Sequence, residues 1–223
     1  MDIGKALGFV FEDEEWVVKL LLGAVITLIP IFGQFALMGY AIAVIRNVKA
    51  DSPQPLPAWD NLGEYFTDGL KFWVAVLVYM LPVMILICPI MLVGVLPVLG
   101  GQNEDVVTIL AGISGFMSMG LSCLIVLYSI LLAPVMTVVQ IRYAETGEIG
   151  PCLRLGEIFR FLFANIGGII IALALVLAVG VLVVPIVGAL TLGLLALPAT
   201  VWLTVFSSHL YGQIGRQAVP DSI

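Results

Sequence analysis

Few side chains in this sequence could do chemistry, and the most suggestive are carboxylates between Arg46 and Lys71. Asp60 and Asp68 lie in a segment rich in proline and aromatic residues, where carboxylates can act as general acid and base. They support one hypothesis, a membrane enzyme that uses carboxylates of a cytoplasmic loop. The sequence has no GxSxG, no HExxH and no phosphate-binding glycine loop. We therefore predict that the protein is not an enzyme.

The single histidine, His209, is the one candidate ligand for a metal, that of a haem or a chlorophyll. No second ligand and no haem-attachment motif accompanies it, and Cys88, Cys123 and Cys152 lack a metal-binding spacing. A hydrogen-bonding histidine near the membrane surface is the favoured interpretation. We predict no metal site and no cofactor, while a bound lipid or pigment is compatible with the sequence.

The composition indicates that lipid surrounds most of the chain. Of the 223 residues, 61% are hydrophobic and only 11% are charged, whereas a soluble domain has about 25% charged residues. The net charge is −6, and no run of Lys or Arg suggests a nucleic-acid partner. Backbone groups in lipid must bond within their own segment, so long apolar blocks are helices. The sequence predicts an all-α, polytopic membrane bundle.

We predict one membrane domain over residues 1–223, with six transmembrane helices and short interfacial helices near 58–67 and 152–160. Turns at Pro30–Gly33 and Pro185–Gly188 divide two of the apolar blocks, because proline removes a helix donor and glycine permits a tight turn. In one alternative, the first block is one long kinked helix and five helices cross; in another, the short segment before Pro30 is re-entrant. Six helices place all nine Lys and Arg residues on one side, as expected of cytoplasmic flanks. The predicted spans are 17–29, 34–46, 70–98, 106–139, 161–184 and 189–211, with cytoplasmic loops 47–69 and 140–160.

The loop over residues 47–69 carries the densest set of polar and aromatic side chains. In a short interfacial helix, Trp59, Leu62 and Phe66 would face the membrane, and Asp68 would cap the span that follows. One interpretation is a recognition loop for a partner or substrate, and the favoured one is an anchor at the membrane surface. The candidate residues are Arg46, Asn47, Pro57, Trp59, Asp60, Asp68 and Gly69.

This stretch resembles the signature of an uncharacterised prokaryotic membrane-protein family that is known only as a domain of unknown function. The similar residues are Arg46-Asn47, then Leu56-Pro57-x-Trp59-Asp60, then Phe66-x-Asp68-Gly69-Leu70-Lys71. The resemblance also covers the acidic and aromatic segment from Phe11 to Trp16 and the Ile29-Pro30-Ile31 turn. It implies a multi-span protein of a bacterium or an archaeon, and it brings no activity or ligand.

Small residues recur at helical spacing in the later spans. Ser114, Ser118 and Ser122 follow one another every four residues. A second stripe with this spacing consists of Ala196, Thr200, Thr204, Ser208 and Gly212. Residues so spaced share one helix face, where small side chains let helices approach and hydroxyls bond across. We expect the second stripe to pack against a neighbouring helix, and the alternative is that it lines a path for a solute.

A short internal repeat links the two predicted cytoplasmic loops. The sequence Leu62-Gly-Glu-Tyr-Phe66 recurs as Leu155-Gly-Glu-Ile-Phe159. Each copy follows a span that ends in arginine and precedes another span. This arrangement is typical of a parallel duplication, and repeats are common in transporter folds.

The predicted spans contain no Asp, Glu, Lys or Arg between their ends, which argues against a proton-driven pump. The favoured function is a non-enzymatic accessory or assembly subunit of a larger membrane complex, in contact with the lipid bilayer and other membrane subunits. The alternatives are a permease or facilitator for a small neutral or lipidic molecule, and the membrane enzyme above. We expect a multi-pass protein of a prokaryotic cytoplasmic (inner) membrane, with both termini cytoplasmic.

Overall fold

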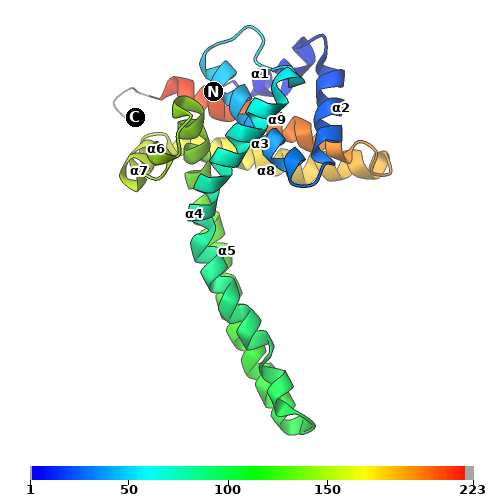
Figure 1. Ribbon diagram of the computed structural model, residues 1–223, viewed down its shortest axis with the longest axis vertical. Helices are drawn as coiled ribbons and strands as arrows, with labels where there is room; N and C mark the ends of the chain where they lie inside the picture. Colours follow the sequence, from blue (N-terminus) through cyan, green and yellow to red (C-terminus); the bar gives the residue numbers. More distant parts are fainter. Residues whose placement is uncertain (1, 219–223) are drawn as a thin grey trace. The chain divides into compact units, whose positions relative to one another are not determined.

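The computed structural model describes residues 2–218, and every regular element in that range is a helix (Figure 1). This confirms the all-α prediction, while the two chain ends, predicted to be cytoplasmic, lie outside the described residues. The elements are α1 (Ile3–Gly8), η1 (Phe9–Glu12), α2 (Trp16–Thr27), α3 (Phe32–Lys49), η2 (Trp59–Asn61), α4 (Leu62–Gly94), η3 (Leu96–Gly100), α5 (Glu104–Thr146), α6 (Ile149–Cys152), α7 (Leu155–Ala164), α8 (Ile166–Leu190) and α9 (Ala196–Gln217).

The chain forms two compact units, Met1–Ala75 with Pro134–Ile223, and Val76–Ala133. In the first unit α9 is the central helix, because it packs against α1, α2, α3 and α8. Every residue of α9 from Ser208 to Gly215 is buried. Gly212 lies so close to α3 that an added Cβ would be 2.6 Å from Cβ of Val48. Small residues thus let the neighbouring helices approach α9 from several sides.

The first apolar block contains two helices rather than one long kinked helix. Helix α2 ends at Thr27 and α3 begins at Phe32, with Pro30 and the positive-φ residue Ile31 in the turn between them. The twelve residues of α2 span about 18 Å at 1.5 Å per residue, whereas the hydrocarbon core is about 30 Å thick. Proline at the turn therefore predicted the break correctly, and the helix before it is short.

The loop before α4 differs from the prediction of a separate interfacial helix over 58–67. One 3₁₀ turn, Trp59–Asn61, leads directly into α4, which continues from Leu62 to Gly94. Asp68 therefore lies inside a helix and does not cap one, which corrects its predicted role. No proline interrupts residues 62–70, so the helix of the loop and the span join into one. Near the second predicted interfacial helix, 152–160, the structure has helix α7, Leu155–Ala164, which buries Ile158, Phe161 and Leu162.

The predicted turn at Pro185–Gly188 is wrong, because α8 continues through Pro185 to Leu190. The chain turns instead at residues 191–195, where Leu192 and Gly193 have φ angles of 51° and 88°. A proline removes one hydrogen bond of a helix, and apolar helices in lipid tolerate that loss. The positive φ values, which a helix does not permit, are what end α8.

The second unit consists of the adjoining parts of α4 and α5, joined through η3. The hydroxyl of Tyr128 donates to the Tyr79 carbonyl at 2.6 Å, and that of Ser114 to the Val93 carbonyl at 2.8 Å. Of residues 76–133, only Tyr79, Val93, Ser114 and Leu132 are buried. Among the described residues, three segments are long and apolar enough to cross a membrane: Trp59–Gly100, Glu104–Thr146 and Ile166–Leu190.

Candidate functional site

The loop before α4 is held against the first unit by the indole ring of Trp59. This ring stacks on Tyr40 with centroids 4.0 Å apart and planes inclined by 6°, and it is only 7% exposed. Its Nε1 donates to the Lys19 carbonyl at 2.8 Å, and the Tyr40 hydroxyl donates to the Pro57 carbonyl at 2.9 Å. The loop thereby closes over the core formed by α2, α3 and α9.

The other signature residues also form contacts within the chain. Arg46 forms an ion pair with Asp68 at 2.6 Å, and its Nε donates to the Ala144 carbonyl at 3.0 Å. Asn47 Nδ2 donates to the Pro55 carbonyl at 3.2 Å. Asp60 differs from these residues because its side chain is exposed. The contacts favour a structural role for most of the seven candidates and leave Asp60 accessible to a partner.

Gly69 belongs to a close crossing of α3 and α4 that its sequence position alone does not reveal. A Cβ added to Gly69 would lie 1.9 Å from the Phe35 carbonyl oxygen, and one added to Gly39 would lie 1.8 Å from that of Tyr65. No side chain fits at either position, so glycine is required for the two backbones to approach. Gly39 was not predicted as a site residue.

A chain of ion pairs joins α3, α5 and α7 in the first unit. Lys49 pairs with Glu145, and Arg142 binds both Glu145 at 3.3 Å and Glu157 at 2.8 Å. The side chain of Arg142 is 5% exposed, so the two carboxylates compensate its charge in a buried position. Glu157 also bonds Arg154 at 3.1 Å, and this hydrogen bond is the main reason that the pKa of Glu157 is lowered.

The two copies of the internal repeat each begin a helix but differ in their ion pairs. Leu62 begins α4 and Leu155 begins α7. Arg142 binds Glu157 within the second copy, whereas Arg46 binds Asp68, which lies beyond the first copy. The residue that matches Glu157 in the first copy is Glu64, which is exposed, so the duplication stays a prediction from the sequence.

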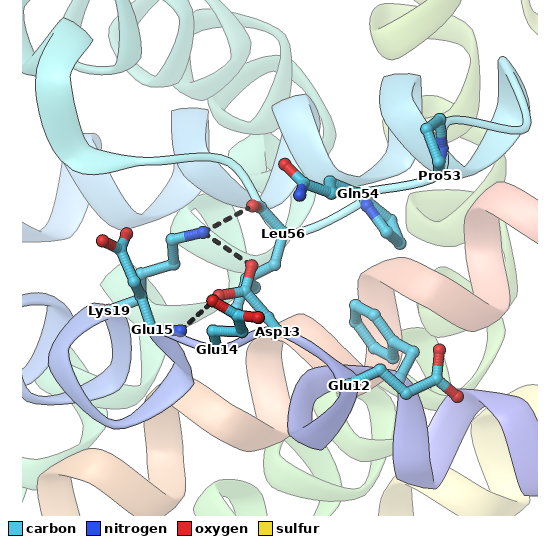
Figure 2. A pocket seen from close by; sticks show the side chains of 10 residues that line it. Glu12, Asp13, Glu14, Glu15, Lys19, Pro53, Gln54 and Leu56 are labelled. Carbon is cyan, nitrogen blue, oxygen red and sulfur yellow. Dashed lines mark hydrogen bonds and ion pairs between the residues drawn. The ribbon is translucent and has the colours of Figure 1, made fainter.

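An acidic pocket of about 380 Å³ lies between the start of α2 and the proline-rich loop (Figure 2). Lys19 pairs with Asp13 at 2.6 Å and donates to the Leu56 carbonyl at 3.2 Å, while Asp13 also accepts from the Glu15 backbone at 2.9 Å. Glu12, Glu14 and Glu15 line the pocket and are exposed. The sequence showed the acidic run but not the pocket, whose other wall, residues 53–56, is distant in the chain.

The small-residue stripe of α9 uses its hydroxyls within its own helix. Thr200 donates to the Ala196 carbonyl at 2.9 Å, Thr204 to that of Thr200 at 3.0 Å, and Ser208 to that of Thr204 at 2.8 Å. Gly212, at the end of the stripe, packs against α3 as described. Thr204 also lines a small pocket of about 150 Å³ together with Gln34 and Gln140. Packing therefore accounts for one end of the stripe, and the middle borders a cavity.

His209 is 2% exposed and lies between two side chains that fix its ring. Phe9 stacks on it with centroids 4.2 Å apart, and its Nδ1 is 3.0 Å from Nε2 of Gln213. The Gln213 amide in turn binds the backbone of Asp2 through both of its polar atoms, at 2.6 and 2.9 Å. This geometry supports a hydrogen-bonding histidine that helps attach the N-terminal helix.

Over residues 2–218 the fold is all-helical, and three of the helices in that range are long and apolar enough to cross a membrane. The chain belongs to the family described as "Protein of unknown function (DUF4013)", which it matches over residues 22–192. The expectation of an uncharacterised family is therefore confirmed. No curated protein and no solved structure matches the chain.

Proposed function

We propose that the protein is a non-enzymatic accessory or assembly subunit of a larger membrane complex. The observation that carries this proposal is an open face of small residues on α5. Ala111 and Gly115 lie four positions apart, as do Ser118 and Ser122. Ser118 follows Gly115 by three positions, so all four residues share one helix face. Steps of this kind let a second transmembrane helix approach closely.

The described residues do not cover this face. Ala111, Gly115 and Ser122 are exposed, and a Cβ added to Gly115 would meet no atom within 4 Å. The neighbouring Ser114 differs, because it is buried and bonded to the Val93 carbonyl of α4. In lipid, a serine hydroxyl on an open face gains from bonding to another helix. A helix of another membrane subunit is the partner that such a face would accept.

We further propose six spans in a prokaryotic inner membrane, with both termini cytoplasmic. The support is the placement of lysine and arginine on one side when six helices are assumed. In this arrangement the chain enters the membrane through α2 and returns to the same side through α3, and α2, with 12 residues, is the shortest of the proposed spans.

The matched pair Gly115→Leu and Gly120→Leu tests the accessory role. Both glycines lie on α5 with no atom within 4 Å of an added Cβ, and they face nearly opposite directions. Each variant therefore changes helix propensity and apolarity alike. We expect Gly115→Leu to reduce co-purification of partner subunits in mild detergent and Gly120→Leu to leave it unchanged. Equal yields of partner from the two variants would contradict the proposed face.

A second candidate function, a facilitator for a small neutral molecule, is favoured by the pocket between Gln34, Gln140 and Thr204. Two amides and a hydroxyl supply uncharged donors and acceptors. If this pocket is part of a path, Thr204→Leu should block flux of the solute into vesicles while the protein still assembles. Unchanged flux in that variant would remove this candidate.

A further inference from the structure

An apolar groove of about 500 Å³ lies between α2, α8 and α9. Leu21 of α2, Val187 of α8 and Ala199 of α9 form three of its walls, and every residue that lines it is apolar or aromatic. Its volume is in the range of pockets that hold small molecules, about 300–1,000 Å³. A groove without any polar lining fits an alkyl chain.

Two residues that line the groove flank a run of four acidic residues in the sequence. Phe11 and Trp16 line the groove and contact each other edge to face, with centroids 5.0 Å apart. The residues between them are Glu12, Asp13, Glu14 and Glu15, whose side chains are drawn in Figure 2. Lys19 neutralises Asp13, whereas Glu12, Glu14 and Glu15 are exposed and form no ion pair among residues 2–218.

We propose that this groove binds the alkyl chain of a cationic amphiphile, with the ammonium head beside Glu12, Glu14 and Glu15. Three uncompensated carboxylates attract a cation and repel a phosphate or sulfate, so the charge selects the head group. The rings of Phe11 and Trp16 add a favourable surface for an ammonium group. The apolar groove itself contributes affinity without discriminating between heads. This inference does not rest on the accessory role.

The test compares two probes of equal chain length on the whole purified protein in dodecyl maltoside. Both carry a bromine at the end of a dodecyl chain, and their heads are trimethylammonium and sulfate. Quenching of tryptophan fluorescence reports binding, because Trp16 and Trp202 line the groove, and Trp202→Phe should remove much of the signal. We expect the cationic probe to bind about tenfold more tightly than the sulfate probe, because each of the three exposed glutamates contributes a charge contact of modest strength.

Two sets of variants separate the head from the chain. The triple variant Glu12→Gln, Glu14→Gln, Glu15→Gln should abolish the preference for the cation, whereas Glu104→Gln with Asp105→Asn, an acidic pair at the start of α5, should preserve it. Ala199→Phe should fill the groove and weaken both probes, and Val183→Phe provides the same test from α8 if the first variant does not fold. Equal affinity for the two probes in the unmodified protein, a preference that survives the triple variant, or binding unaffected by both groove variants would overturn the proposal.

Discussion

At the scale of single residues, the glycines at the crossing of α3 and α4 give the sharpest prediction. Gly39→Ala or Gly69→Ala places a Cβ less than 2 Å from a carbonyl oxygen of the facing helix, and the backbones must separate. We expect a loss of about 2 kcal/mol or more in the free energy of unfolding, at the upper end of overpacking effects. Unfolding in detergent, followed by circular dichroism, measures this loss.

The matched control is Gly63→Ala on α4, the helix of Gly69, where an added Cβ meets nothing within 4 Å. Alanine is a better helix former than glycine, so this variant should be neutral or stabilised by up to about 1 kcal/mol. If the three variants lose stability equally, glycine is not required for close approach at this crossing.

Cys152 gives a prediction about reactivity. Burial raises the pKa of its thiol to about 11, because the thiolate loses solvation in the interior. A water-soluble maleimide at pH 8 should therefore label Cys152 slowly in the folded protein and rapidly after unfolding, when the thiol regains an ordinary pKa near 8.5. Mass spectrometry of the peptides measures this directly. Rapid labelling before unfolding would show that Cys152 is not buried.

At the scale of helices, Arg142 of α5 binds Glu157 of α7. It also binds Glu145, the carboxylate that Lys49 of α3 binds. Arg142→Ala leaves Glu145 with Lys49 and Glu157 with Arg154, so part of the charge compensation survives. We expect Arg142→Ala to lower the free energy of unfolding by about 2 kcal/mol. This loss is smaller than the loss expected when a buried charge keeps no partner at all. Thermal unfolding in detergent is the measurement.

Arg154→Ala is the control, because Arg154 binds the same Glu157 but its side chain is 65% exposed. Solvent screens such a pair, and stability should barely change. A larger effect from Arg154 than from Arg142 would mean that burial does not determine the strength of these contacts.

The helices also show what the sequence could predict. The break at Pro30 and the helix α7 follow from local signals, a turn and an apolar face. Local signals do not predict that α8 continues through Pro185 or that α4 continues through Asp68. A proline or an aspartate occurs both at helix ends and inside helices, and the neighbouring residues decide between the two. The contacts of Trp59 with Tyr40 and of Arg46 with Asp68 join distant segments. Local sequence signals therefore could not predict these contacts.

At the scale of the whole molecule, the charge distribution supports the proposed orientation in the membrane. Six spans with both termini inside predict that a reporter fused before Asp13 is active in the cytoplasm. A reporter placed in the turn after η3, near Gln102, should be active on the opposite side. An external reporter before Asp13 would support five spans and would place Lys5 and Lys19 on the opposite side from the remaining basic residues.

The proposed accessory role rests on the small-residue face of α5, which the chain itself does not cover. The sequence predicts only part of this face. The spacing of Ser118 and Ser122 predicted a packing face. Only the structure shows that a Cβ added to Gly115 meets no atom of the described residues within 4 Å. Such a face defines the kind of partner, a transmembrane helix that packs closely.

The most direct test is to extract the tagged protein from its native membrane in mild detergent and to determine the mass and composition of the intact particle. We predict a particle that contains at least one different membrane protein in a fixed ratio to this chain. A particle that contains this chain alone, or the chain with lipid only, would contradict the accessory role.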